Sequence, residues 1–303
     1  MNFLNKIQKY SSNLCFVDSN QKNFLYKDVL EKSEKIVDNL KSRSLIFVLA
    51  QNDVECITSY IGFFRKNMVQ MFLDPKTSHN LLVNLIEKYL PNYIFIPNSL
   101  NKNFTNYETT TKLSNYSILK LKKHVSHSLN KDLALLLSTS GSTGSKKFVK
   151  ISYENIYYNT KSINKFLKIK EKDKTITTMP PFYTYGLSVI NTHLFAGASI
   201  LVTEAKAIEK KFWELIKKEK INSFAGVPYF YEILNKIKFA EFNLPYLKYF
   251  TQAGGPLRRD LIEYFLKYSE NNKKKFIIMY GQTEATARMT YLPYEKLRKK
   301  IGS

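Results

Sequence analysis

The chain has 303 residues, of which 44% are hydrophobic and 14% aromatic, and this ordinary globular composition excludes collagen-like, mucin-like and disordered proteins. Its 47 Lys and Arg residues outnumber 25 Asp and Glu residues, so the formal net charge is +22. The longest apolar runs, 45–50 and 133–137, are far shorter than the roughly 18 residues of a membrane helix, and residues 1–10 lack the apolar core of a signal peptide.

The low cysteine content excludes a disulfide-rich protein. Cys15 and Cys56 are the two cysteines, too few for a disulfide framework or a closed zinc site. Together with the absence of a membrane span, they predict a soluble, cytoplasmic protein.

The basic charge has a simpler explanation than nucleic-acid binding. Only six of the 47 basic residues are Arg, and the Lys excess accompanies abundant Asn, Ile, Tyr and Phe, which AT-rich codons encode. Nucleic-acid interfaces favour Arg, and no zinc-finger spacing, basic-region heptad or aromatic ribonucleoprotein motif is present. We therefore expect no nucleic-acid partner, and a surface with some attraction for polyanionic substrates.

Short apolar runs alternate with segments of helical periodicity from the start of the chain. We expect strands over 45–50, 69–73 and 93–96, and helices over 32–40, 53–65 and 81–89. Residues 98–130 are polar and weakly patterned, which predicts a connecting segment. A strand over 133–137 follows, and Ser152 is a suitable N-cap for a helix over 153–166.

The second half repeats this alternation. We expect strands over 175–179, 199–203, 221–225, 247–252 and 276–279, and helices over 185–195, 208–219, 228–238 and 256–268. Strands that alternate with helices indicate βαβ units. The sequence therefore predicts an α/β fold of two similar, mostly parallel sheets flanked by helices. We expect a first subdomain over 1–130 and a second over 131–303.

The strongest local signal is the segment 139–147, Thr-Ser-Gly-Ser-Thr-Gly-Ser-Lys-Lys. Glycines allow tight backbone turns and close approach of amides to an anion, and the hydroxyls and lysines add donors. It is not a Walker loop, because Lys146 stands where that motif needs glycine. A flexible linker is the alternative, although a linker does not normally lie between a buried strand and a capped helix. The composition indicates a phosphate-binding loop.

Two further motifs follow predicted strands. In 279–285, Glu284 is a hard oxygen ligand suited to Mg²⁺, Thr283 offers a hydroxyl to a phosphate, and Tyr280 offers a flat face to a base, although a helix cap is an equal alternative. In 252–257, paired glycines indicate a tight turn or a wall for a planar ligand. All three motifs follow strand ends, where open α/β sheets bind ligands.

Taken together, these segments resemble the adenylate-forming superfamily of acyl- and aryl-CoA synthetases, nonribosomal adenylation domains and luciferases. Residues 139–147 are similar to its phosphate loop, and 280–284 (Tyr-Gly-Gln-Thr-Glu) resemble its Tyr-Gly-x-Thr-Glu motif. Residues 253–257 are similar to its adenine-side Gly-Gly segment, while 180–186 resemble its aromatic motif, and 226–228 (Gly-Val-Pro) also fit. The resemblance extends over nearly the whole chain.

The resemblance implies a large N-terminal domain that activates a small-molecule carboxylic acid as an acyl-adenylate. It implies ATP and Mg²⁺ as cofactors, and CoA or a carrier-protein thiol as the acceptor. The implied phosphate contacts are Thr139, Ser140, Gly141, Ser142, Thr143, Gly144 and Lys147. The implied nucleotide contacts are Gly254, Gly255, Pro256, Tyr280, Gly281, Gln282 and Thr283, with Glu284 on the metal. The implied acyl-pocket residues are Phe182, Tyr183, Gly186 and Gly226, and the implied catalytic residues are Lys147, Thr283 and Glu284.

The chain departs from the family pattern in three places. The family usually has Pro-Lys-Gly after the loop, whereas here Lys147 takes the place of the lysine and the proline is missing. Tyr183 stands where the aromatic motif usually has His, and no Asp adjoins it to bind an α-ammonium group, which favours a substrate without a free α-amino group. The sequence ends at Ser303, before the family's ribose-binding Asp and its small C-terminal domain with the catalytic Lys.

We therefore expect that catalysis by this chain needs a complementary C-terminal polypeptide. The alternative is a non-catalytic nucleotide-binding relic, or a subunit that acts only with a partner.

Overall fold

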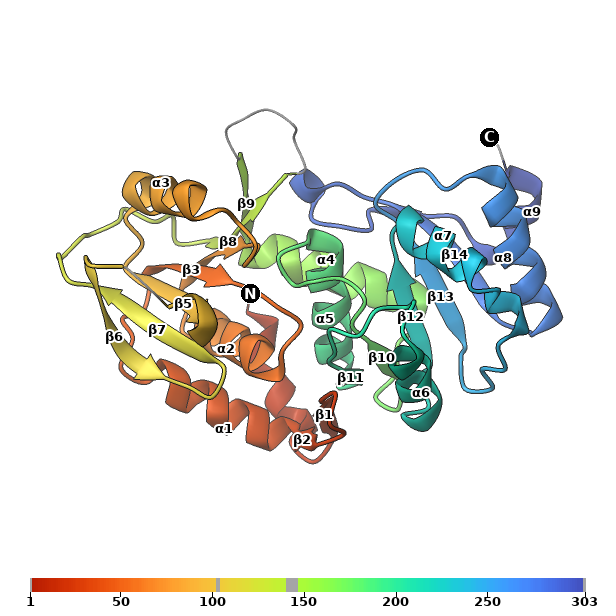
Figure 1. Cartoon of the computed structure of the whole chain (residues 1–303), viewed down its shortest axis with the longest axis horizontal. Coiled ribbons are helices and arrows are strands. Elements are labelled where there is room, and N and C mark those ends of the chain that lie inside the picture. Colours follow the sequence, from red (N-terminus) through yellow and green to blue (C-terminus); the bar gives the residue numbers. More distant parts are fainter. Residues whose placement is uncertain (1, 102–103, 140–146, 302–303) are drawn as a thin grey trace. The chain divides into compact units, whose positions relative to one another are not determined.

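The computed structural model describes residues 2–101, 104–139 and 147–301, which form two compact units (Figure 1). The first unit contains Met1–Ser12, Leu25–Tyr158 and Pro180–Tyr183. The second contains Asn13–Phe24, Asn159–Met179 and Thr184–Ser303. Each unit has a mostly parallel sheet with helices, which confirms the predicted fold class.

The sheet of the first unit has the strand order β6-β7-β5-β3-β4-β8-β9. Its strands are β3 (Leu45–Leu49), β4 (Val69–Leu73), β5 (Tyr93–Pro97), β6 (Tyr107–Lys112), β7 (Tyr116–Leu121), β8 (Leu133–Ser138) and β9 (Phe148–Ser152). Its helical segments are η1 (Phe3–Asn5), η2 (Ile7–Tyr10), α1 (Tyr26–Val37), α2 (Val54–Arg65), α3 (His79–Tyr89) and η3 (Asn98–Leu100). Every residue of β3, β4 and β5 is buried, as their mostly apolar sequences predict.

Two expectations about this unit need correction. The segment 98–130 is not merely a connection, because it contains the antiparallel hairpin of β6 and β7. Most of β6 is exposed, and solvent-facing edge residues explain the polar composition. The first sheet also extends beyond the expected boundary at residue 130, since Gln70 of β4 pairs with Leu135 of β8.

α4 (Tyr153–Leu167) begins where the sequence predicts. The backbone N–H of Asn155 donates to Ser152 Oγ at 3.0 Å, and the N–H of Ser152 donates to Asn155 Oδ1 at 3.1 Å. This reciprocal pair satisfies two amide donors that have no partner within the helix. The prediction of Ser152 as the N-cap is confirmed.

The sheet of the second unit has the strand order β15-β14-β13-β12-β10-β11-β1-β2. Its strands are β1 (Leu14–Val17), β2 (Asn23–Leu25), β10 (Lys174–Ile176), β11 (Ser199–Leu201), β12 (Ser223–Gly226), β13 (Tyr249–Gln252), β14 (Lys275–Tyr280) and β15 (Thr290–Tyr291). Its remaining helical segments are α5 (Thr184–Ala196), α6 (Lys210–Lys218), α7 (Pro228–Lys236), η4 (Phe239–Glu241), α8 (Arg259–Asn271), η5 (Thr283–Ala285), η6 (Tyr294–Lys296) and α9 (Leu297–Lys300).

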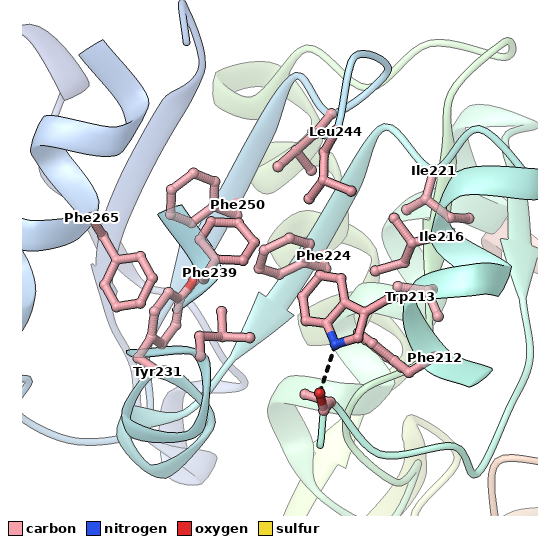
Figure 2. Packing of buried hydrophobic residues seen from close by; sticks show 14 of the residues in the cluster. Phe212, Trp213, Ile216, Ile221, Phe224, Tyr231, Phe239, Leu244, Phe250 and Phe265 are labelled. Carbon is pink, nitrogen blue, oxygen red and sulfur yellow. Dashed lines mark hydrogen bonds between the residues drawn. The ribbon is translucent and has the colours of Figure 1, made fainter. Parts of the chain in front are cut away.

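One face of this second sheet carries a cluster of aromatic side chains (Figure 2). Phe250 on β13 stacks on Phe224 of β12 and on Phe276 of β14, with ring centroids 5.5 and 5.0 Å apart. Trp213 from α6 joins the cluster, and its indole N–H donates to the Ala207 carbonyl at 2.7 Å (dashed line in Figure 2). Because alternate residues of a strand point to opposite faces, the neighbours of these phenylalanines face away from the cluster.

Candidate active site

The carboxyl ends of three parallel strands bring the sequence motifs of the second unit to one edge of its sheet. β12, β13 and β14 are neighbours in register, with Gly226 opposite Gln252 and Gln252 opposite Ile278. The segments that leave these strands therefore start side by side. Gly226, the Gly-Gly segment and the Tyr-Gly-Gln-Thr-Glu motif share this edge, which is where α/β sheets of this kind bind ligands.

The Gly-Gly segment is held in a closely packed turn. Gly254 has φ of 88°, in the left-handed region that favours glycine. The side-chain amide of Gln252 donates to the Gly255 carbonyl at 2.8 Å. A Cβ on Gly255 would lie 3.2 Å from Pro228 Cγ, and a Cβ on Gly226 would overlap the Phe230 ring. The close packing leaves no room for side chains at Gly226 and Gly255, so the surface of this turn consists mainly of backbone atoms.

The Tyr-Gly-Gln-Thr-Glu motif leaves β14 with its polar groups accessible. Tyr280 is 60% exposed. Thr184, the first residue of α5, donates its hydroxyl to Thr283 Oγ1 at 3.0 Å. A Cβ on Gly281 would lie 2.3 Å from the backbone N of Arg288, so only glycine lets the motif fold back on this segment.

Glu284 suits a magnesium ion that is bound mainly by phosphate. Its side chain is exposed and forms no ion pair or hydrogen bond with the residues that the structure describes. The same residues contain no group of three or more His, Cys, Asp or Glu that could hold a metal. Mg²⁺ commonly takes one or two protein carboxylates and completes its shell with phosphate oxygens and water, so a single free carboxylate fits this ion.

Only the ends of the predicted phosphate loop can be placed. The N–H of Thr139 donates to the Lys147 carbonyl at 3.2 Å, next to the pairing of Ser138 with Phe148, so the loop joins β8 to β9 in the first unit. Lys147 is exposed. Ser140, Gly141, Ser142, Thr143 and Gly144 lie outside the described residues.

The residues expected to border an acyl pocket are divided between the units. Phe182 and Tyr183 are half-buried and belong to the first unit, and burial raises the pKa of Tyr183. Gly186 is buried in the first turn of α5, in the second unit, and Gly226 ends β12 in the same unit.

The sequence did not predict the buried polar contacts that join α5 to β13 and to the segment after Glu284. Tyr185 OH lies 2.7 Å from Thr251 Oγ1, and the buried side chain of Arg288 reaches α5. The position of Arg288, four residues after Glu284 in a chain with few arginines, is the signal that could have drawn attention to it.

The buried His193 should make stability depend on pH. Its Nδ1–H donates to the Val189 carbonyl at 2.8 Å, and burial lowers its pKa from 6.5 to about 4. Between these pH values the unfolded chain binds a proton that the folded chain does not, so the free energy of unfolding should fall as the pH decreases through this range. At about 1.4 kcal/mol per pKa unit, the full effect is on the order of 3 kcal/mol.

Urea titrations at pH 7 and pH 4.5 measure this effect. In His193→Asn, whose amide can still donate to Val189, the decrease should be smaller than in the wild type, whereas His124→Gln, at an exposed histidine, should behave as the wild type does. Equal acid sensitivity in the wild type and His193→Asn would contradict the prediction.

The fold is an α/β fold with two sheets flanked by helices, and three of the sequence motifs lie on one sheet edge of the second unit. The chain belongs to the family of AMP-binding enzymes, whose model matches residues 3–303. In the described residues no helix has the length and apolar character needed to cross a membrane.

Acyl-CoA ligases are among the relatives of this chain. The chain is 28% identical over 170 residues to the 2-succinylbenzoate–CoA ligase of Listeria innocua, covering 56% of this chain and 35% of that protein. It is 25% identical over 315 residues to YtcI of Bacillus subtilis, an uncharacterized acyl–CoA ligase, covering 94% of this chain and 59% of that one. The chain thus spans between about a third and three fifths of these relatives.

Solved structures show the same fold. The o-succinylbenzoate CoA synthetase (MenE) of Bacillus subtilis, in complex with the acyl-adenylate intermediate OSB-AMP, superimposes with a TM-score of 0.80 at 16% identity. The match covers 100% of this chain and 63% of that one.

Proposed function

We propose that this chain is the nucleotide- and acid-binding part of an AMP-forming acid–thiol ligase. The observation that carries the proposal is the edge of β12, β13 and β14, where the Gly-Gly segment and the Tyr-Gly-Gln-Thr-Glu motif start side by side and Glu284 pairs with none of the described residues. The ligase names of the relatives and the acyl-adenylate bound by MenE support it.

In the proposed reaction, a carboxylate oxygen attacks the α-phosphorus of ATP and pyrophosphate leaves. Such chemistry depends on positioning and on neutralisation of phosphate charge.

Thr283 would donate to the α-phosphate, and Tyr280 and the 254–256 backbone would hold the adenine between them. Mg²⁺ held by Glu284 would supply positive charge to the phosphates. Lys147 and the loop that it ends would bind the β- and γ-phosphates, and Tyr183 would border the acyl group. A thiol of CoA or of a carrier protein would then accept the acyl group, and AMP would leave.

Equilibrium binding tests the nucleotide part of this proposal. The purified chain should bind Mg·ATP, and AMP should compete for the same site. A chain that binds neither nucleotide at millimolar concentration contradicts the proposal. Because the relatives are longer, we propose that pyrophosphate exchange needs a complementary C-terminal polypeptide, and vigorous exchange by the chain alone would contradict this second part.

Lys147 should bind the outer phosphates of ATP. Lys147→Ala removes a point charge, so ATP affinity should fall by about tenfold to a hundredfold, while the affinity for adenosine should not change. Lys150→Ala changes an exposed lysine on the neighbouring strand and should leave both affinities unchanged. Isothermal calorimetry with ATP, AMP and adenosine measures the difference. Equal losses for all three ligands would place Lys147 away from the phosphates.

A further inference from the structure

The second sheet carries buried polar side chains, among apolar ones, on the face opposite its aromatic cluster. Tyr249 and Thr251 flank Phe250 on β13, so their side chains leave the sheet on the side away from that cluster. The hydrogen bond from Tyr185 to Thr251 shows that α5 packs against this side. A buried polar layer therefore lies between α5 and the sheet, although apolar contacts usually fill such interiors.

This layer contains the guanidinium of Arg288, which is 4% exposed. Its Nε donates to Ser188 Oγ at 2.9 Å, and its Nη2 donates to the Ser188 carbonyl at 2.7 Å and to Thr192 Oγ1 at 3.1 Å. These acceptors are all neutral. The buried carboxylate of Asp173 is engaged by Lys248 and by the Lys170 N–H instead.

Arg288 therefore carries a buried charge without a counter-ion among the described residues. Its Nη1 makes no hydrogen bond to them either, so one edge of the guanidinium has no partner there. Burial lowers the pKa of Arg288 to about 10, which leaves it charged at neutral pH. A buried charge that only neutral groups contact is costly, and an anion at the free edge would offset that cost.

Three buried polar atoms make no hydrogen bond of good geometry in the part of the chain that the structure describes: His193 Nε2, Ser223 Oγ and Tyr249 OH, of which the last two lie close enough for Ser223 to lower the pKa of Tyr249. Ser223 and Tyr249 occupy paired positions on β12 and β13. The charges of Arg288 and of the Lys248-paired Asp173 both act on the pKa of His193 and of Tyr249, so these groups lie within reach of the guanidinium and of that carboxylate. Folded proteins pair nearly all such atoms, and groups left unpaired around a cation indicate a place for a polar ligand.

We propose that Arg288 recognises a second carboxylate on the acid substrate, so that the preferred substrate is a dicarboxylic acid. The inference rests on the proposed function, because it assigns the acid that this site activates. Arg288 follows the motif by four residues, and its backbone contacts Gly281, so a small acid whose reacting carboxylate lies at the α-phosphate beside Thr283 would present its other carboxylate to Arg288. A carboxylate matches the planar fork of a guanidinium and accepts two hydrogen bonds from it. The hydroxyls of Ser223 and Tyr249 are further donors.

Binding to the whole chain tests this assignment. The chain is saturated with the α,β-methylene analogue of ATP and Mg²⁺, and calorimetry measures the affinity for straight-chain acids of three to eight carbons, each as the mono- and the dicarboxylic acid. We expect one dicarboxylic acid to bind at least tenfold more tightly than its monocarboxylic counterpart. Arg288→Met should remove this preference and leave the affinity for the analogue unchanged. Arg298→Met, at an exposed arginine paired with Glu270, should retain the preference.

Each outcome decides the proposal. A wild-type chain that binds the analogue but shows no preference for any dicarboxylic acid overturns this inference alone. Failure to bind the analogue overturns the proposed function as well. If Arg288 has only a structural role and holds the segment after Glu284 against α5, Arg288→Met should lower the affinities for both kinds of acid and for the analogue together. If that variant does not fold, Arg288→Lys keeps the charge but loses the fork, and the preference should fall at least threefold.

Discussion

Glu284→Gln should abolish most of the Mg²⁺-dependent gain in ATP affinity while the protein stays folded. The exposed carboxylate has no structural partner among the described residues, so its replacement removes a ligand and not a support. Loss of one charged contact costs about 1.5–3 kcal/mol, which corresponds to roughly one to two orders of magnitude in affinity. Titrations of ATP with and without Mg²⁺ measure the gain directly.

A matched variant separates the metal effect from a general loss of negative charge. Glu241→Gln removes an exposed carboxylate that ends η4, outside the sequence motifs, and pairs with Lys238. It should retain the full effect of Mg²⁺. If Glu284→Gln responds to Mg²⁺ as the wild type does, Glu284 is not the metal ligand.

Phe250→Ala should cause the largest loss of stability. Phe250 is fully buried and packs on rings from β12, β14 and α8, including a contact of 6.1 Å between ring centroids with Phe265. Removal of a buried phenyl group loses transfer free energy and leaves a cavity, which together cost about 3–5 kcal/mol. Urea unfolding followed by circular dichroism should show the transition of the second unit at a clearly lower urea concentration.

The control for this variant is a large apolar side chain on the surface. Ile208 is 68% exposed, so Ile208→Ala should change the free energy of unfolding by no more than about 0.5 kcal/mol. Equal destabilisation by the two variants would mean that the aromatic cluster does not govern the stability of this unit.

The sequence alone determined most of the buried strands, most of the longer helices and the motif positions. Apolar runs such as 69–73 coincide with strands, and the hydroxyl of Ser152 caps α4 as predicted, because periodicity and capping depend on residues only a few positions apart. The motifs at 252–257 and 280–284 follow strand ends, so their shared edge also follows from the order of parallel strands.

Tertiary structure decided which segments pair and what becomes buried. The hairpin of β6 and β7 was missed because an edge strand with a solvent-exposed side has a polar composition. β8 joins the first sheet beside β4, and β1 joins the second beside β11, through pairings between residues far apart in the chain. Local sequence encodes the period of a strand but not its partner, since the partner depends on which sheet edges remain open and which faces must be covered.

The same reason explains Arg288. By its sequence it is one more cation in a strongly basic chain, set apart from the exposed Arg298 only by its place four residues after Glu284. Only the packing of α5 against the polar face of β13 removes Arg288 from water and leaves it among neutral acceptors. Burial of a charge is a property of the assembled fold, because it depends on groups that the chain brings together from about a hundred residues away.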